Sequence, residues 1–443
     1  MKRFSFALVL CALAFAGVTF SDSAYAADRA HTLKVYNWAD YIDMDNVLNT
    51  FPAWYKEQTG EDVTIQYSTF DINESMLTQI EVGHEDYDVI CPSEYIIERM
   101  LRDGLLLPID TNFGATPNYT KNVAPFAVDK FQQMSDSLTV SDYAVGYMWG
   151  TTGVLYNPKY VDAADLQSWG FLLNPKFKNH IFMKDAFRDI YSVVVLYAYR
   201  DEIARGEVTR DDLVAHLTPE RIKRVEDILI QAKENIAGWE VDFGKEDMTK
   251  GQTWMNVSWS GDAQWAIDEA ADGVELRYIV PEEGSNVWFD GWCIPKYAKN
   301  RKAASYFINY LCKPENAILN MEEIGYVSVI ASPEVLEWAD DAAENEETVD
   351  LSYFFGDSAT AVHANQVFYP DKSVIDRCAL MHDCADQTSD MLEMWNRVKG
   401  DNLSVGMVVF LGVVLVLIIA GVVYAVINNR KKKAQQRSRK NRR

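Results

Sequence analysis

Apolar residues recur along the chain in short runs that alternate between the period of a strand and that of a helix. Between residues 33 and 102 the order is strand, helix, strand, helix, strand, helix. The predicted strands are 33–38, 63–69 and 87–93, and the predicted helices are 45–59, 73–82 and 94–102. This alternation predicts an α/β fold with a mainly parallel sheet. In such folds, ligands bind beyond the carboxyl ends of the strands.

The later part of the chain has the same character. A strand-rich region begins near residue 143, helices are predicted over 189–203 and 219–235, and a strand is predicted to run into a helix over 255–270. About 370 residues lie between the two ends described next, too many for one ordinary hydrophobic core. Two domains are therefore expected.

Both ends of the chain carry apolar segments of another kind. Residues 1–26 combine a basic start, an apolar run and a small-x-small cleavage site, which is typical of a secretory signal peptide. Residues 405–427 contain no charge and would span about 35 Å as a helix, enough to cross a bilayer core of about 30 Å. The basic tail, 428–443, is expected in the cytoplasm. We therefore expect a single-pass cell-membrane protein whose bulk is extracytoplasmic, in the periplasm or at the cell surface. The tail then needs no nucleic-acid partner.

Charge narrows the ligand class. The whole chain has a formal net charge of −23, of which residues 1–26 contribute +1 and the tail +9, so the exported body carries −33. Such a field attracts cations and argues against an anionic ligand. Five cysteines remain after export, an odd number with no zinc-ligand spacing. Cys378 and Cys384 are the only locally suggestive pair, and their disulfide state is left open, whereas Cys91 and Cys293 are expected to be buried thiols.

The segment NVWFDGWCIP contains the first candidate site. In an extended strand Trp288 and Asp290 point to the same face. An indole attracts a cation and a carboxylate accepts its N–H donors, so the pair makes half a socket for an organic ammonium. An isolated pair of this kind is more often a core Trp beside a surface Asp. Its repetition, with Trp or Tyr near Asp elsewhere in the chain, favours a binding site.

The chain resembles a known family, the solute-binding proteins of polyamine (spermidine/putrescine) ABC transporters. The resemblance runs from about Leu33 to Val398. It rests on blocks that occur in this order: VYNWADYI (35–42), STFDINESM (68–76), YDVICPSEYIIERM (87–100), YMWGTTGVLYN (147–157), SWSGDAQWA (258–266), VWFDGWCIP (287–295) and EEIGYV (322–327).

The resemblance implies a periplasmic-binding-protein-like fold, with two α/β lobes that are joined by strand crossovers and close on the ligand like a hinged clamp. Lobe 1 would contain residues 27–147 and 289–335, and lobe 2 residues 148–288 and 336–400. The implied ligand-binding residues are Trp38, Asp40, Tyr41, Ser93, Tyr95, Asp185, Asp189, Trp259, Asp262, Trp288, Asp290 and Tyr326.

These residues have distinct expected roles. The tryptophans would stack along the methylenes of a polyamine, and Asp290 and Asp262 would hold one ammonium. Asp185 or Asp189 would lie toward the other end, while the tyrosines and the serine would orient the carboxylates. Arg188 stands where some relatives have an acid, which leaves open whether Asp185, Asp189 or both face the ligand. The block around Asp262 is more similar to that of putrescine-type members.

The sequence thus predicts the extracytoplasmic binding component of a polyamine importer, with ABC permease and ATPase subunits as partners and without cofactor or metal. Catalysis is not expected, because no G-x-S-x-G, P-loop or H-E-x-x-H motif occurs. A membrane-tethered sensor of polyamines or other cationic solutes, without a transport role, is the alternative.

Overall fold

The computed structural model describes residues 29–241, 243–341, 343 and 348–400. The chain divides after Leu392 into two compact units, and the sheet and the site discussed below belong to the first.

The strands are β1 (Thr32–Trp38), β2 (Thr64–Phe70), β3 (Val89–Ile90), β4 (Leu106–Leu107), β5 (Ala144–Tyr156), β6 (Ile181–Lys184), β7 (Ile236–Glu240), β8 (Met255–Trp259), β9 (Arg277–Ile279), β10 (Ser285–Pro295), β11 (Val327–Ser328), β12 (Thr348–Val349), β13 (Val362–His363) and β14 (Cys378–Leu380).

The α-helices are α3 (Phe51–Thr59), α4 (Asn73–Glu81), α5 (Glu94–Arg102), α6 (Pro125–Gln132), α7 (Phe187–Ala198), α8 (Arg200–Ala204), α9 (Arg210–Ala215), α10 (Pro219–Ala232), α11 (Phe243–Thr249), α12 (Ser260–Asp268), α13 (Arg301–Leu311), α14 (Pro314–Ile324), α15 (Pro333–Asp341), α16 (Ser352–Phe355), α17 (Lys372–Ile375) and α18 (Thr388–Lys399). The shorter helices are η1 (Met44–Leu48), η2 (Tyr119–Asn122), η3 (Val140–Asp142), η4 (Ala163–Leu166), η5 (Trp169–Leu173), η6 (Pro175–Phe177) and η7 (Ala385–Gln387).

The main sheet has the strand order β2-β1-β3-β10-β5-β8-β6-β7. Its outer parts are parallel, since β1 pairs parallel with β2 and β3, and β6 pairs parallel with β7 and β8. At the centre, β10 is antiparallel to β3 and β5, and β5 is antiparallel to β8. The expectation of a mainly parallel sheet was therefore wrong: the sheet is mixed, because two long strands run against their neighbours.

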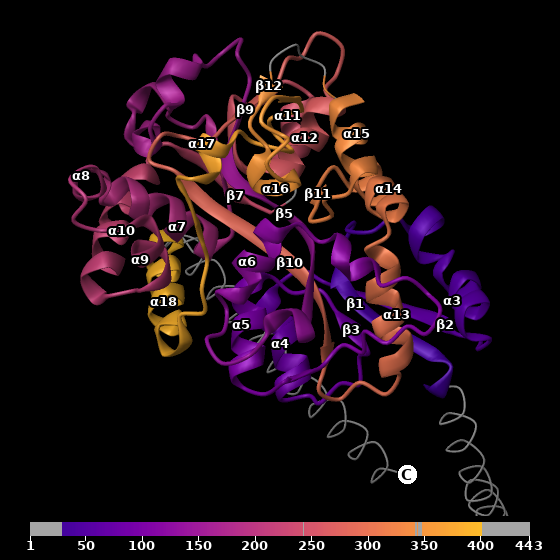
Figure 1. Ribbon diagram of the computed structural model, residues 1–443. Coiled ribbons are helices and arrows are strands. Elements are labelled where there is room, and N and C mark those ends of the chain that lie inside the picture. The colour runs from indigo at the N-terminus through magenta and orange to yellow at the C-terminus, as the bar shows by residue number, and fades with distance from the viewer. Residues whose placement is uncertain (1–28, 242, 342, 344–347, 401–443) are drawn as a thin grey trace, which may run out of the picture. The chain divides into compact units, whose positions relative to one another are not determined.

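β5 and β10 lie side by side in the middle of the sheet and connect its two halves (Figure 1). Every residue of both strands is buried. Strands buried on both faces have continuous apolar runs, which is why YAVGYMWGTTGVLY and NVWFDGWCIP show little alternation. Tyr147 and Trp149 lie in the core, with exposed fractions of 4% and 0%.

Most predicted elements between residues 33 and 102 are confirmed, and the differences have local causes. The helix predicted over 45–59 is broken at Thr50 into η1 and α3, and Pro52 lies in the first turn of α3, where its missing N–H costs nothing. Gly60, with φ of 76°, ends this helix. The strand predicted over 87–93 shortens to β3.

Two predicted segments, the signal peptide over 1–26 and the membrane span over 405–427, lie outside the described residues. Among the residues that the structure describes, no helix is both long enough and apolar enough to span a bilayer. The five cysteines beyond residue 26 are buried and free of disulfide bonds, as predicted for Cys91 and Cys293.

Candidate functional site

Asp290 is a buried carboxylate held by two hydroxyl groups. Tyr41 donates to its Oδ2 at 2.7 Å and Ser93 donates to its Oδ1 at 2.6 Å. Asn73 in turn donates to the Ser93 hydroxyl at 3.0 Å. Burial raises the pKa of Asp290 to about 6, although the two hydroxyl donors lower it. Among the described residues, no basic side chain forms an ion pair with this carboxylate.

A bulge in β10 produces this arrangement. The pairing of β10 with β5 shifts between Phe289 and Gly291, and Asp290 instead bridges to Ser93, at the end of the β3 segment. Ser93 precedes α5, yet its hydroxyl does not cap the helix because it is turned to Asp290. A bulge of this kind re-aims one side chain, and here it brings a crossover strand to the carboxyl end of β3.

Aromatic rings surround the same carboxylate. The ring of Tyr326 contacts those of Tyr41 and Trp288, with centroids 5.3 and 5.6 Å apart. Two glycines make room for this packing: a Cβ on Gly150 would lie 2.6 Å from the Trp288 ring, and a Cβ on Gly261 would overlap the Tyr326 ring. The aromatic wall therefore depends on backbone positions without side chains.

Asp189, in the first turn of α7, is the second buried carboxylate. Its Oδ1 accepts hydrogen bonds from Asn286 at 2.9 Å, Trp259 at 3.2 Å and Thr152 at 3.3 Å. Burial raises its pKa, and its charge also raises the pKa of Asp290. Asp189 therefore lies close enough to Asp290 for its charge to act on that carboxylate.

Asp262, in the first turn of α12, has a different environment. Its carboxylate lies 2.7 Å from the Lys184 ammonium and 3.0 Å from that of Lys245, and accepts from the Tyr326 hydroxyl at 2.9 Å. Burial opposes ionisation, but the two lysines outweigh it and hold the pKa of Asp262 at about 2. This carboxylate already has cationic partners within the chain.

Arg188 connects α7 to the opposite part of the sheet. Its guanidinium lies over the Tyr95 ring, 4.1 Å from the centroid, and 3.6 Å from the carboxylate of Glu74. It also donates to the Thr388 hydroxyl at 3.0 Å. Tyr95 is thus buried beneath an arginine.

The remaining predicted residues are less closely joined to this cluster. Trp38 ends β1 and packs on Phe70 with ring centroids 4.5 Å apart, and its indole N–H has no hydrogen-bond partner in the described structure. Asp40 is exposed in a turn, with φ of 49°. Asp185 is half-buried, and its backbone N–H donates to the carbonyl of Glu240 at 2.6 Å.

Several residues at the site were missed by sequence reasoning. Glu94, wholly buried, accepts from the Phe289 backbone N–H at 3.0 Å, and the charge of Asp290 contributes to its raised pKa, after burial. Asn73, Asn286 and Lys184 provide polar contacts that no motif indicated. Polar residues within apolar segments, such as the lysine that ends IFMK, were the sequence signal that could have indicated these buried contacts. No described group of three or more His, Cys, Asp or Glu residues could hold a metal ion.

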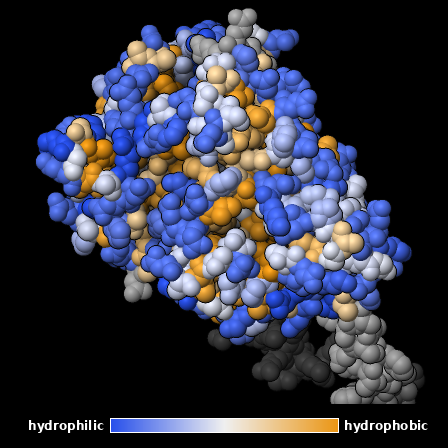
Figure 2. Space-filling view, in the orientation of Figure 1, coloured by the Kyte–Doolittle hydropathy of each residue, from blue (hydrophilic) through white to orange (hydrophobic). Residues whose placement is uncertain are grey.

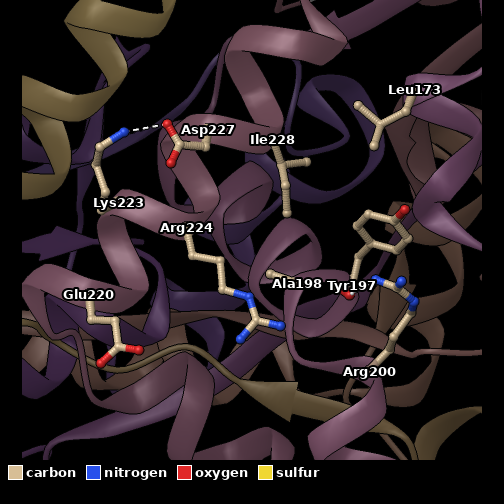
Figure 3. A pocket seen from close by; sticks show the side chains of 9 residues that line it. All are labelled: Leu173, Tyr197, Ala198, Arg200, Glu220, Lys223, Arg224, Asp227 and Ile228. Atoms are coloured by element: carbon tan, nitrogen blue, oxygen red, sulfur yellow. Dashed lines mark hydrogen bonds and ion pairs between the residues drawn. The ribbon is translucent and has the colours of Figure 1, made fainter.

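A separate hollow lies between α7, α8 and α10, with a volume of about 540 Å³. Figure 3 shows that charged side chains border it, with Lys223 paired to Asp227. None of its lining residues belongs to the cluster formed by Asp290, Asp189, Asp262 and the aromatic rings around them.

In Figure 2, hydrophobic residues gather in the middle of one face and hydrophilic residues flank them.

Several known proteins are similar in sequence to this chain. A family model described as bacterial extracellular solute-binding protein matches residues 53–348. The chain is 29% identical over 302 residues to the putrescine-binding periplasmic protein PotF of Escherichia coli, covering 65% of this chain and 75% of that protein. It is 28% identical over 331 residues to the spermidine/putrescine-binding periplasmic protein of Salmonella typhimurium, covering 74% and 84%.

Solved structures are similar as well. A putative spermidine/putrescine ABC transporter protein from Listeria monocytogenes has a TM-score of 0.63 at 28% identity, covering 83% of this chain and 99% of that one. The spermidine/putrescine ABC transporter substrate-binding protein PotD from Streptococcus pneumoniae, solved with calcium and HEPES, has a TM-score of 0.61 at 28% identity, covering 83% and 98%. These similarities support a two-lobed α/β fold. Because the family model matches more than half of its residues, the chain belongs to the bacterial extracellular solute-binding proteins.

Proposed function

We propose that this protein is the extracytoplasmic binding component of an ABC importer that captures polyamines of the putrescine and spermidine type. The observation that carries the proposal is Asp290, a buried carboxylate with hydroxyl and aromatic neighbours and no ion-pair partner among the described residues. Burying such a group without a cation is costly, and an ammonium ligand would offset that cost. The printed names of its relatives support the same ligand class.

The proposal includes finer features. The ligand would enter between the lobes predicted from the sequence, with Asp290 and Asp189 facing one ammonium and Trp288, Trp38 and Trp259 along the methylenes. Residues 405–427 would anchor the protein in the cell membrane, near permease and ATPase subunits. The ligand is bound and released unchanged.

Calorimetric titration of the purified protein with putrescine, cadaverine, spermidine and spermine tests the proposal. We expect a Kd on the order of micromolar or tighter for at least one of them. Asp290→Asn keeps the size of the side chain and removes its charge, so the affinity should fall at least about thirtyfold, which corresponds to about 2 kcal/mol. Silence toward all four amines, or an unchanged affinity in the variant, would contradict the proposal.

A further inference from the structure

A second set of aromatic and acidic groups adjoins the Asp290 site. Asp262 lies beside Trp259 and accepts from the Tyr326 hydroxyl at 2.9 Å. The Tyr326 ring then contacts Trp288, with centroids 5.6 Å apart. The Tyr326 ring also contacts Tyr41, whose hydroxyl donates to Asp290, so two tyrosines link the carboxylates of Asp262 and Asp290. Each carboxylate has the composition of an ammonium socket.

The socket at Asp262 already contains an ammonium group. Lys184 ends β6 and is wholly buried, and its Nζ lies 2.7 Å from the Asp262 carboxylate and 3.4 Å from that of Glu240. Nζ also donates to the backbone carbonyl of Val241 and lies 4.4 Å from the centroid of the Trp259 ring. An ammonium has three donors, and here three oxygen groups and one π face surround it.

Strand register explains why Lys184 reaches this place. β6 and β7 are parallel neighbours in which Lys184 pairs with Glu240, so the two side chains share a face of the sheet. β6 also pairs with β8, which leads directly into α12 and Asp262. The lysine is therefore fixed by the sheet itself.

The charges divide the cluster into two parts. Asp262 and Glu240 are balanced by Lys184 and Lys245, whose ammonium lies 3.0 Å from Asp262. Asp290 and Asp189 have hydroxyl, amide and indole donors instead, and no described cation pairs with them. A ligand cation is therefore needed beside Asp290 and Asp189, and it is not needed beside Asp262 and Glu240.

We infer that Lys184 occupies the place of a second ligand ammonium, so that the protein binds its amine ligand through a single ammonium group, at Asp290. This inference rests on the proposed function and refines it. A single ammonium on an apolar chain is sufficient for recognition, and a second ammonium on the ligand gains nothing at Asp262.

Butylamine and putrescine test the inference, since they share a four-carbon chain and differ by one ammonium. Each is titrated against the full-length protein and against Lys184→Ala, which vacates the space beside Asp262 and Glu240. In the wild type we expect the two Kd values to agree within about threefold. In Lys184→Ala the preference for putrescine should rise at least about tenfold, because the second ammonium can now pair with Asp262.

Lys302→Met is the matched control, because it removes a half-exposed lysine whose ion pair, with Glu61, includes no residue of this cluster. It should leave the butylamine-to-putrescine ratio unchanged. If Lys184→Ala does not fold, Lys184→Val also removes the ammonium and frees most of its space while suiting a buried strand position, with the same rise expected.

The outcomes separate this inference from the function on which it rests. A wild type that prefers putrescine tenfold or more, or a variant whose preference does not rise, overturns the inference while amine binding stands. Absence of binding for both amines in the wild type and the variants overturns the proposed function and, with it, the inference.

Discussion

Asp290 and Asp262 show how two buried carboxylates of one protein acquire opposite properties. Asp290 has only neutral donors, so burial dominates and its pKa rises to about 6. Asp262 has two lysines within 3.0 Å, and its pKa falls to about 2. The first group is costly to keep ionised until a cation arrives, whereas the second is ionised in the free protein.

The dependence of stability on pH follows from these shifts. The folded protein binds the Asp290 proton more tightly than the unfolded chain, whose Asp pKa is near 3.8, so this group lowers stability above pH 6. The penalty disappears as the pH falls from about 6 to about 4. Asp262 has the opposite sign: it contributes stability above its unfolded pKa, and that contribution is lost below about pH 4.

Unfolding by urea at pH 4, 5 and 7 measures this effect in the ligand-free protein. Asp290→Asn should be more stable than the wild type by about 1–3 kcal/mol at pH 7, and the difference should vanish near pH 4. A difference that is constant between pH 4 and pH 7 would mean that Asp290 is not buried as described.

Local patterns predicted the elements well and their long-range arrangement poorly. The alternation from β1 to α5 was visible because each segment carries its own period and its own turn residues. The bulge at Asp290 and the antiparallel direction of β5 and β10 depend on pairing with segments distant in the sequence, which a local pattern does not indicate. The same holds for Lys184, whose carboxylate partner Asp262 lies 78 positions away. The burial of Asp189 likewise depends on where α7 begins, which the local pattern did not show.

The N-terminal turn of α12 illustrates how an element shapes the site. Gly261 allows the Tyr326 ring to lie against this turn, where a Cβ would overlap the ring. Gly261→Ala should therefore displace Tyr326, break its hydrogen bond to Asp262, and weaken amine binding at least about tenfold, or about 1.4 kcal/mol. Titration calorimetry of the variant measures the loss.

Tyr326→Phe is the companion variant, because it removes only the hydroxyl and keeps the ring. It should cost less than Gly261→Ala, about 0.5–1.5 kcal/mol, the range of one hydrogen bond. Equal losses would indicate that the hydroxyl, and not the position of the ring, is what matters.

At the scale of the whole molecule, the two halves of the sheet are connected by β5 and β10 and by contacts between side chains. Arg188 extends from α7 to Tyr95 on α5 and Glu74 on α4, which belong to the other half. A buried guanidinium over an aromatic ring stabilises by about 0.5–2 kcal/mol. This residue therefore helps to hold the two halves together in the described structure.

Arg188→Met tests that role by thermal unfolding. We expect a Tm lower by about 2–5 °C, since about 1 kcal/mol changes the Tm of a protein of this size by a few degrees. Arg200→Met is the control: its guanidinium lies over Tyr197 near the protein surface, 4.5 Å from the ring centroid, and its removal should change the Tm by less than about 1 °C. Equal Tm values for both variants would exclude a special role for Arg188.

The hydrogen bond between Tyr41 and Asp290 joins residues 249 positions apart in the chain. Contacts of such long separation close large loops and form slowly during folding. The socket cannot exist while only the first half of the chain has been made, because the carboxylate has not yet joined the hydroxyls. Capture of an amine by this protein therefore indicates that β10 has already joined the segments that follow β1 and β3.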